Sequence, residues 1–202
     1  MPLISIESVM PGIRLGLWKI DETVGMLLDD YPFLHCYDNE IGRYSSDRRR
    51  CEVLAVRMLI RLMVGENVVL SHDTDCKPYL DNGMHIGISH TRGLAAVIVS
   101  SDRVVSVDVE YVSERVGRVA SRLLRSDERA DTLHEKLLHW CVKETLYKLY
   151  SSEHLALSDM RVLSVYGNDA GGHVSAKNVQ RDDTLNVVYR VSDGYMLTYA
   201  VL

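Results

Sequence analysis

The stretch MHIGISHTRGLAAVIVSSDRVVSVDVE, residues 84–110, decides the fold. Three of its runs are rich in β-branched residues and predict strands: MHIGIS, LAAVIVS and RVVSVDVE. The first two flank the loop His90-Thr91-Arg92-Gly93, and the third follows Ser101-Asp102. Glycine, serine and aspartate favour tight turns. The stretch therefore predicts antiparallel strands joined as a meander.

The residues before this stretch predict two short strands and a helix. Apolar segments around Ile4 and from Ile13 to Ile20 have the length of strands. From about Asp47 to Met63, apolar residues recur at spacings of three and four, and Gly65 follows as a stop signal. An amphipathic helix of this kind is expected to pack its apolar face on a sheet.

The second part of the chain repeats this order of helix and strands. Ser126, followed by Asp127 and Glu128, has the residue types of a helix N-cap, and a long helix is predicted from about Leu133 to Tyr150. Strand-like segments follow near residues 160–166, 173–178, 184–191 and 195–201. We therefore expect an α+β fold that is a pseudo-dimer of two similar α/β halves, each a helix packed on a mainly antiparallel sheet. The expected halves are residues 1–102 and 103–202.

Composition limits the possible functions. The chain has 202 residues of which 47% are hydrophobic, enough to bury a core. No apolar run has the length of a membrane span, and the first residues lack the basic region of a signal peptide, so we expect a cytoplasmic protein without a membrane partner. The net charge of −5 argues against nucleic acid as a partner, so any anion site must be local. Four dispersed cysteines without a CxxC spacing predict reduced thiols.

Two carboxylates in the third predicted strand are candidates for a metal site. Asp108 and Glu110 are two positions apart, so both side chains point to one face, roughly 7 Å apart along the strand. Mg2+ is held by one or two carboxylates together with water and phosphate oxygens. The alternative is that both carboxylates lie on the solvated outer face of an edge strand. The alternating pattern fits both interpretations.

The predicted helix at 133–150 carries a stripe of chemically active residue types. Trp140, Lys143, Glu144, Tyr147 and Lys148 are spaced so that they share one helical face. Glu144 and Lys148 alone are more typical of an i,i+4 surface pair. Their combination with a tryptophan and a second lysine favours a site, in which Glu144 is a third metal ligand and Lys148 holds phosphate.

Three other elements have residue types that contact anions. Lys77 precedes a proline that stiffens the chain, Ser89 and His90 end a predicted strand, and the run Arg48–Arg50 begins the first predicted helix. Each element also has an explanation without a ligand. The lysine can be a solvated loop residue, the histidine can make structural hydrogen bonds, and the arginines can form a solvent-exposed surface. None of them decides the function alone.

In their order along the chain, these pieces resemble the phosphopantetheinyl transferase superfamily, specifically its larger monomeric, surfactin-synthetase-activating type. The motifs are KPYL at 77–80, GISHT at 87–91, SVDVE at 106–110, RLLRSDE at 122–128 and WCVKETLYK at 140–148. Their order and intervals are similar to the successive motifs of that family, over the stretch from about Arg48 to Tyr150. Ser106 and Thr145 stand where the family usually has glycine and alanine.

The resemblance implies an activity and a set of site residues. The implied reaction transfers the 4′-phosphopantetheine group of coenzyme A to a serine of an acyl or peptidyl carrier protein and releases 3′,5′-ADP. The implied cofactor is Mg2+, held by Asp108, Glu110 and Glu144, and the implied catalytic residues are Glu144 and Lys148. The residues implied for coenzyme A binding are Arg48, Lys77, Ser89, His90, Asp108 and Lys148, with Arg49 as the alternative to Arg48.

A run of arginines in the second part predicts a docking surface for the carrier protein. Arg115, Arg118, Arg122 and Arg125 step along one helical face and would steer an acidic partner. A solvated helix face is the alternative. For the whole chain, the competing functions are a catalytically inactive coenzyme A-binding module of the same fold and an unrelated metal-dependent phosphohydrolase.

Overall fold

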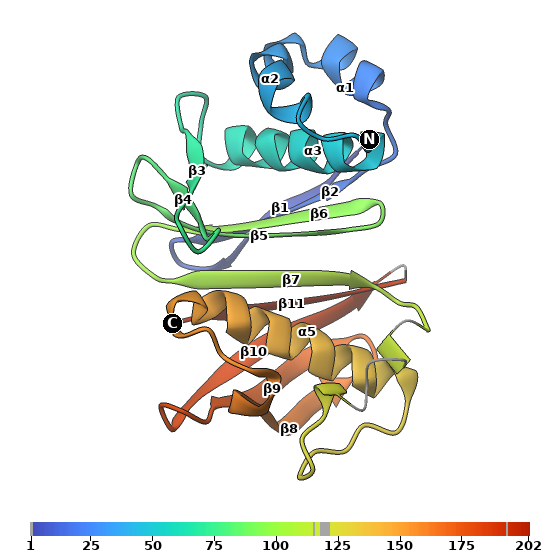
Figure 1. Cartoon of the computed structure of the whole chain (residues 1–202), viewed down its shortest axis with the longest axis vertical. Helices are drawn as coiled ribbons and strands as arrows, with labels where there is room; N and C mark the ends of the chain where they lie inside the picture. The colour runs from blue at the N-terminus through green and yellow to red at the C-terminus, as the bar shows by residue number, and fades with distance from the viewer. Residues whose placement is uncertain (1, 115, 118–121, 193) are drawn as a thin grey trace.

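The computed structural model describes residues 2–114, 116–117, 122–192 and 194–202 and has an α+β fold with antiparallel sheets (Figure 1). Within these ranges the helices are α1 (Val24–Asp30), the 3-10 helix η1 (Pro32–Tyr37), α2 (Asp38–Ile41), α3 (Asp47–Met63), α5 (Leu133–Leu149), and the 3-10 helices η2 (Ser151–Glu153) and η3 (Leu157–Asp159). The strands of the same ranges are β1 (Leu3–Met10), β2 (Ile13–Lys19), β3 (Leu70–His72), β4 (Pro78–Leu80), β5 (His85–Thr91), β6 (Leu94–Ser100), β7 (Val105–Tyr111), β8 (Met160–Asn168), β9 (Gly171–Asn178), β10 (Asp183–Ser192) and β11 (Tyr195–Val201). Among the described residues, no helix combines the length and the apolar character needed to cross a membrane.

The first sheet has the strand order β1-β2-β6-β5, and α3 covers one of its faces (Figure 1). The predicted helix at 47–63 is confirmed. Every residue of β6 is buried. Ala95, Val97 and Val99 belong to the core beneath α3, whereas Leu94, Ala96 and Ile98 belong to the core on the opposite face. Burial on both faces explains why β6 reads as a continuous apolar run.

The predicted meander is wrong at its third strand. β5 and β6 form the expected antiparallel hairpin, but β7 pairs with β11 and not with β6. The valines of β7, Val105, Val107 and Val109, are buried in the same core as Ile98 of β6. They therefore pack face to face on the first sheet instead of extending it. The chain changes sheets between Ser100 and Val105, while the division into halves at 102/103 stays a prediction.

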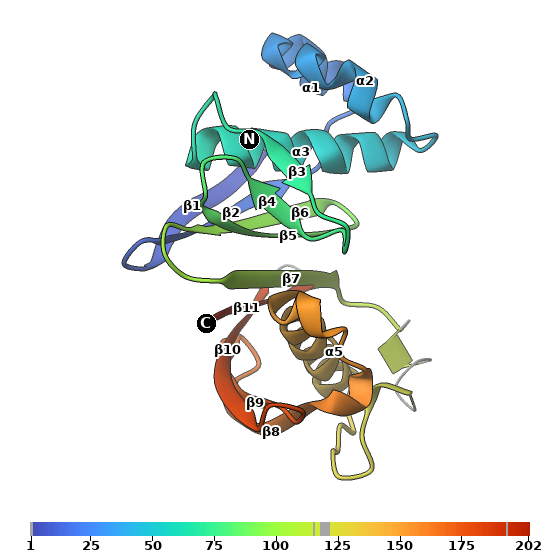
Figure 2. The same ribbon diagram turned by 60° about the vertical axis from the view of Figure 1, so that its left-hand side comes forward.

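The second sheet has the strand order β7-β11-β10-β9-β8 and curves around α5 (Figure 2). The helix begins at Leu133 as predicted, but the N-cap predicted at Ser126 is wrong. Thr132 is the N-cap, because its Oγ1 accepts a hydrogen bond from Glu135 N at 3.1 Å and the Glu135 carboxylate accepts one from Thr132 N at 2.9 Å. The layers thus run in the order α3, first sheet, second sheet and α5 (Figures 1 and 2).

Gly87 on β5 lets the two sheets approach closely. A Cβ atom at this position would lie 2.9 Å from Ile98 Cγ2, 3.0 Å from Ser106 Cα and 3.1 Å from Val107 N. Two of these three atoms are backbone of β7 and have little freedom to move. The absence of a side chain at Gly87 therefore sets the distance between β5 and β7.

Substitution of Gly87 by alanine is expected to lower the free energy of unfolding by about 1–3 kcal/mol, the usual effect of an overpacked methyl group. Gly25→Ala is the matched control, because among the described residues a Cβ there meets only Thr23 Oγ1 at 3.9 Å, and alanine in α1 favours the helix. Urea unfolding of both variants measures the difference. Equal stability of the two variants would show that the sheets are free to separate at Gly87.

Candidate active site

A buried carboxylate and a lysine form the centre of the candidate site. Asp108 on β7 is only 3% exposed, and its Oδ1 accepts a hydrogen bond from Lys148 Nζ of α5 at 2.7 Å. Lys148 Nζ also donates to Ser89 Oγ of β5 at 3.1 Å and to the carbonyl oxygen of Val107 at 3.2 Å. Ser89 Oγ donates to Asp108 Oδ1 at 3.0 Å. The solvated-face interpretation is therefore wrong for Asp108, which joins three elements of the fold.

Glu110 lies two residues further along β7 and is partly buried. Its Oε1 accepts from Trp140 Nε1 at 3.2 Å, and its Oε2 accepts from Thr91 Oγ1 at 3.4 Å. Burial raises the pKa of Glu110, and the negative charge of Asp108 raises that pKa further. Both oxygens of this carboxylate thus accept hydrogen bonds from neighbouring side chains, while burial and the nearby Asp108 disfavour its ionised form.

Glu144 of α5 completes the group of acids. Burial raises the pKa of Glu144, the charges of Asp108 and Glu110 raise it further, and Lys148 opposes these effects. The three carboxylates therefore lie close enough to repel one another. Partly buried like charges are unfavourable by themselves, and such clusters are typical of sites that bind a cation or handle protons.

The carboxylate oxygens of the three acids are the ligand type that a hard divalent cation prefers, but the three side chains are not arranged around one common point. In the described part of the chain, no three His, Cys, Asp or Glu side chains are arranged to hold a metal ion as they lie. Asp108 Oδ2, however, is buried and has no hydrogen-bond partner among the described residues. Mg2+ needs only one or two carboxylates, since water and phosphate oxygens supply its other ligands. The magnesium site stays a prediction, and the unpartnered Asp108 Oδ2 is the observation in its favour.

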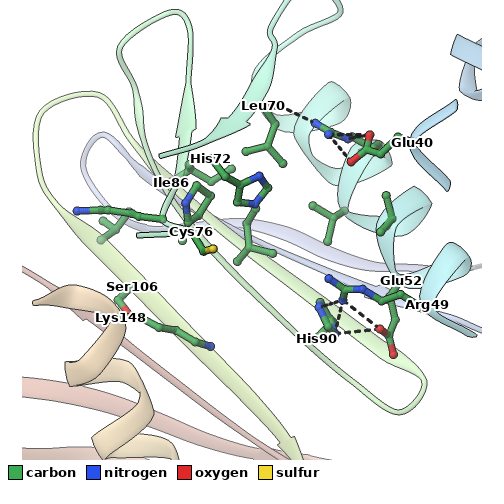
Figure 3. Close-up of a pocket in the computed structure, with 18 of the residues that line it drawn as sticks. Glu40, Arg49, Glu52, Leu70, His72, Cys76, Ile86, His90, Ser106 and Lys148 are labelled. Carbon is green, nitrogen blue, oxygen red and sulfur yellow. Dashed lines mark hydrogen bonds and ion pairs between the residues drawn. The ribbon is translucent and has the colours of Figure 1, made fainter. Parts of the chain in front are cut away.

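A cavity of about 280 Å3 lies beside Lys148 (Figure 3). α3, the β3–β4 hairpin and β5 supply most of its wall, and α2, Tyr44, β7 and α5 supply the rest. Its Lys and Arg residues are Arg49, Arg57, Lys77 and Lys148, accompanied by His72 and His90, and its acids are Glu40 and Glu52. The cavity is thus locally basic in a chain whose net charge is −5. This agrees with the expectation that any anion site in this acidic chain is confined to one part of its surface.

Arg49, Glu52 and His90 form a cluster on the cavity wall (Figure 3). Arg49 Nη1 lies 3.3 Å from Glu52 Oε2 and contacts His90 Nε2 directly. His90 Nδ1 lies 3.2 Å from Glu52 Oε2. Burial lowers the pKa of His90, and the positive charge of Arg49 lowers it further. A neutral imidazole at neutral pH is therefore favoured, and Arg49 is the fixed positive charge of this cluster.

Arg48, predicted to bind coenzyme A, lies outside this cavity. Its side chain is 72% exposed, its Nε lies 3.6 Å from Glu52 Oε1, and it lines a separate hollow together with Arg92. The helical step of 100° explains the difference, because adjacent residues of α3 face different directions. The structure brings Arg49, the alternative at this position, to the cavity with Lys77 and His90.

Ser89, also predicted to contact coenzyme A, is 7% exposed and faces β7. Its Oγ donates to Asp108, and it accepts from Lys148 Nζ and, at 3.2 Å, from the backbone N–H of Val109. The hydroxyl group is therefore occupied by the acid–lysine centre. Side chains alternate along a strand, which is why His90 lines the cavity and Ser89 does not.

The stripe predicted on α5 is wrong for Lys143. Its side chain is buried on another side of the helix, and its Nζ donates to Glu128 Oε2 at 2.7 Å and to the carbonyl oxygens of Leu123 at 2.8 Å and Leu157 at 3.3 Å. Burial lowers the pKa of Lys143, and the bond to Glu128 opposes this shift. Lys143 therefore stabilises the fold, and the stripe that reaches the site consists of Trp140, Glu144 and Lys148.

Two of the four predicted carrier-docking arginines lie within the described residues. Arg115 and Arg118 lie outside the described residues, and Arg122 is exposed. Arg125 donates to Asp127 Oδ1 at 2.9 Å and to the carbonyl oxygen of Ser158. Arg125 thus has partners within the chain, and the docking surface stays a prediction.

Two contributions to the site were not predicted. Arg57 Nη2 donates to Glu40 Oε1 at 2.7 Å where both residues line the cavity, and Thr91 holds Glu110 as described above. Glu40 comes from the region before Asp47, which carries no recognisable motif, so no local signal indicated it. Thr91 belongs to the GISHT motif, and its position two residues after Ser89 on the same strand was a usable signal.

The two departures from the family pattern contact each other. Ser106 Oγ donates to the carbonyl oxygen of Thr145 at 2.8 Å, and Thr145 Oγ1 lies 2.6 Å from Thr198 Oγ1. Both residues are buried where α5 packs on β7 and β11. Each added hydroxyl group therefore has a partner within the protein: the backbone carbonyl of Thr145 for Ser106, and the Thr198 hydroxyl for Thr145.

Replacement of Glu144 by glutamine is expected to stabilise the protein at neutral pH, because it removes one of three repelling carboxylates. A Tm increase of about 2–4 °C in EDTA corresponds to ~1 kcal/mol for a chain of this size. The raised pKa means that the folded protein binds this proton more tightly, so the wild type should gain stability as pH falls through the raised pKa and the advantage of the variant should shrink. Differential scanning calorimetry between pH 5 and 8 measures both effects. A variant less stable than wild type throughout that range would contradict the repulsion.

No protein-family model matches this chain, and no curated protein matches it either.

Proposed function

We propose that this protein transfers the 4′-phosphopantetheine group of coenzyme A to a serine of an acyl or peptidyl carrier protein in a Mg2+-dependent reaction. One observation carries the proposal. Lys148 lies at the junction of a basic cavity and a group of three repelling carboxylates. A substrate with phosphates at both its nucleotide end and its reacting bond needs both features next to each other.

The cavity suits the nucleotide end of coenzyme A. Arg49 and Lys77 supply positive charge for the 3′-phosphate, and His90 supplies a hydrogen-bonding ring that is favoured in its neutral form. The pyrophosphate then lies toward Lys148, which is 31% exposed on the side chain and can contact a phosphate oxygen. Asp108, Glu110 and Glu144 are the residues that would hold Mg2+. When bound there, the cation neutralises charge on the phosphate oxygens.

The proposed transfer is a displacement at phosphorus. The hydroxyl oxygen of the carrier serine forms a bond to the phosphorus of the phosphopantetheine group, and the bond from that phosphorus to the oxygen of 3′,5′-ADP breaks. Glu144 takes the hydroxyl proton in this proposal, with a water molecule as the alternative acceptor. Lys148 stabilises the negative charge on the phosphate oxygens, and the electron pair of the broken bond leaves with 3′,5′-ADP.

The proposal extends to the architecture, as a pseudo-dimer with the site between its two halves. Two features support it. α3 and α5 both have 17 residues, and each packs on one antiparallel sheet. The residues that would bind the nucleotide come mainly from the first sheet and its helix, whereas the acids and Lys148 come from β7 and α5.

The reaction is tested by the intact mass of an apo acyl carrier protein and an apo peptidyl carrier protein after incubation with this protein, coenzyme A and Mg2+. We expect a gain of one phosphopantetheine group, which EDTA abolishes. Asp108→Asn should reduce the rate by at least about 100-fold, the range for loss of one preorganised charged group. Asp29→Asn, at an exposed position of α1, is the matched control.

The other outcomes separate the competing functions. Cleavage of free coenzyme A without a carrier protein would indicate a phosphohydrolase. Binding of coenzyme A without mass gain on either carrier would indicate an inactive binding module. Normal transfer by Asp108→Asn would show that the acid–lysine centre is not the active site.

Arg49 is expected to contribute to coenzyme A affinity and Arg48 is not. Loss of a charge-assisted hydrogen bond costs ~1.5–3 kcal/mol, so Arg49→Ala should weaken binding by about 10-fold or more. Arg48→Ala removes the same charge from the adjacent residue, outside the cavity, and should change the affinity little. Isothermal titration with coenzyme A in EDTA measures both. A larger loss of coenzyme A affinity for Arg48→Ala would indicate that the nucleotide binds in the separate hollow that Arg48 lines.

A further inference from the structure

Strand β5 presents different chemistry on its two faces. His90 and Ile88 face the basic cavity, while Ser89 and Thr91 face β7. β5 ends the first sheet and β7 ends the second, so two edge strands lie against each other. An edge strand has backbone N–H groups that need acceptors from outside its own sheet.

The hydroxyl groups of β5 meet this need in the same way at two successive levels. Ser89 Oγ accepts from Val109 N at 3.2 Å and donates to Asp108 Oδ1 at 3.0 Å. Thr91 Oγ1 accepts from Tyr111 N at 3.4 Å and donates to Glu110 Oε2 at 3.4 Å. Each hydroxyl thus links a backbone N–H of β7 to the carboxylate of the preceding residue.

The carboxylate at the second level accepts hydrogen bonds from two sides, and the 3.4 Å bond from Thr91 is the longer one. Thr91 holds Oε2 of Glu110, and Trp140 holds Oε1 at 3.2 Å. A carboxylate oxygen has two lone pairs, so one donor on each oxygen leaves a lone pair free on both. The two donors therefore restrict the rotation of the carboxylate while leaving it able to bind a cation.

We propose that Thr91 is a positioning residue that orients Glu110 for metal binding, an inference that rests on the proposed Mg2+-dependent function. Its hydroxyl acts on the metal only through Glu110. Ser89 has the same geometry but also contacts Lys148, so its replacement would change two interactions at once. Thr91 is partly buried near the end of β5, where the hydroxyl can be removed with little change to the core.

The test compares Thr91→Val, which has the same shape without the hydroxyl, with Thr91→Ser, which keeps the hydroxyl. Mn2+ binding is measured by electron paramagnetic resonance of the free ion, with saturating coenzyme A. Loss of a hydrogen bond to a metal ligand typically weakens metal affinity about 10-fold or more, which we expect for Thr91→Val. Thr91→Ser should retain most of the wild-type affinity, as should Thr184→Val at an exposed position of β10.

Two further measurements exclude a merely structural effect. The affinity for coenzyme A in EDTA should be close to wild type in Thr91→Val, because it does not depend on the orientation of Glu110 toward a cation. The Tm in EDTA should fall only slightly, because Tyr111 is exposed and water can replace the hydroxyl as acceptor for its backbone N–H. Unchanged Mn2+ affinity in Thr91→Val, or an equal loss in Thr91→Ser, would overturn the positioning role alone. A wild-type protein that binds no Mn2+ with coenzyme A would overturn the proposed metal-dependent function and this inference with it.

Discussion

The close packing of β5 on β7 is the constraint on which the candidate site depends. Gly87 allows the backbones to approach, and Ser89 then reaches Asp108 on the other sheet. The same contact brings the cavity side of β5 near Lys148 of α5. If the sheets were a side chain further apart, the basic cavity and the acids would be separate surfaces. Sheet packing at one glycine thus determines whether the two sets of charges act together.

The electrostatics of the site are balanced by Lys148. Asp108 is nearly fully buried, and the 2.7 Å bond from Lys148 Nζ compensates its charge. Among the described residues, Glu110 and Glu144 have no comparable ion pair with a cation, and burial together with the neighbouring carboxylates raises their pKa values. A bound cation stabilises such a group of carboxylates more than it stabilises a cluster on the surface. The reason is that folding has already removed water from these carboxylates and brought their charges together.

Much of the fold could be predicted from the sequence because it depends on local patterns. The 3.6-residue periodicity of Asp47–Met63 predicted helix α3 correctly, and the β-rich runs predicted strands β5, β6 and β7. The partner of β7 could not be predicted, because Val105–Val109 fits an edge strand beside β6 as well as a strand packed face to face on it. At the site, spacing placed Asp108 and Glu110 together but could not separate Arg48 from Arg49. That choice depends on the rotation of α3 against the sheet.

Lys143 and Lys148 show why residue type and spacing do not establish a role. Both lie on α5, and within the described residues both have three hydrogen-bond acceptors. These are Glu128 and two carbonyl groups for Lys143, and Asp108, Ser89 and one carbonyl group for Lys148. The difference is exposure, since the Lys143 side chain is 1% exposed and the Lys148 side chain 31%. A phosphate oxygen can replace an acceptor of Lys148 at the cavity wall without opening the core. The same exchange at Lys143 would leave Glu128 buried without its cation, which typically costs ~3–5 kcal/mol. Lys143 therefore contributes to the stability of the fold, whereas Lys148 can exchange an acceptor for a ligand at the cavity wall.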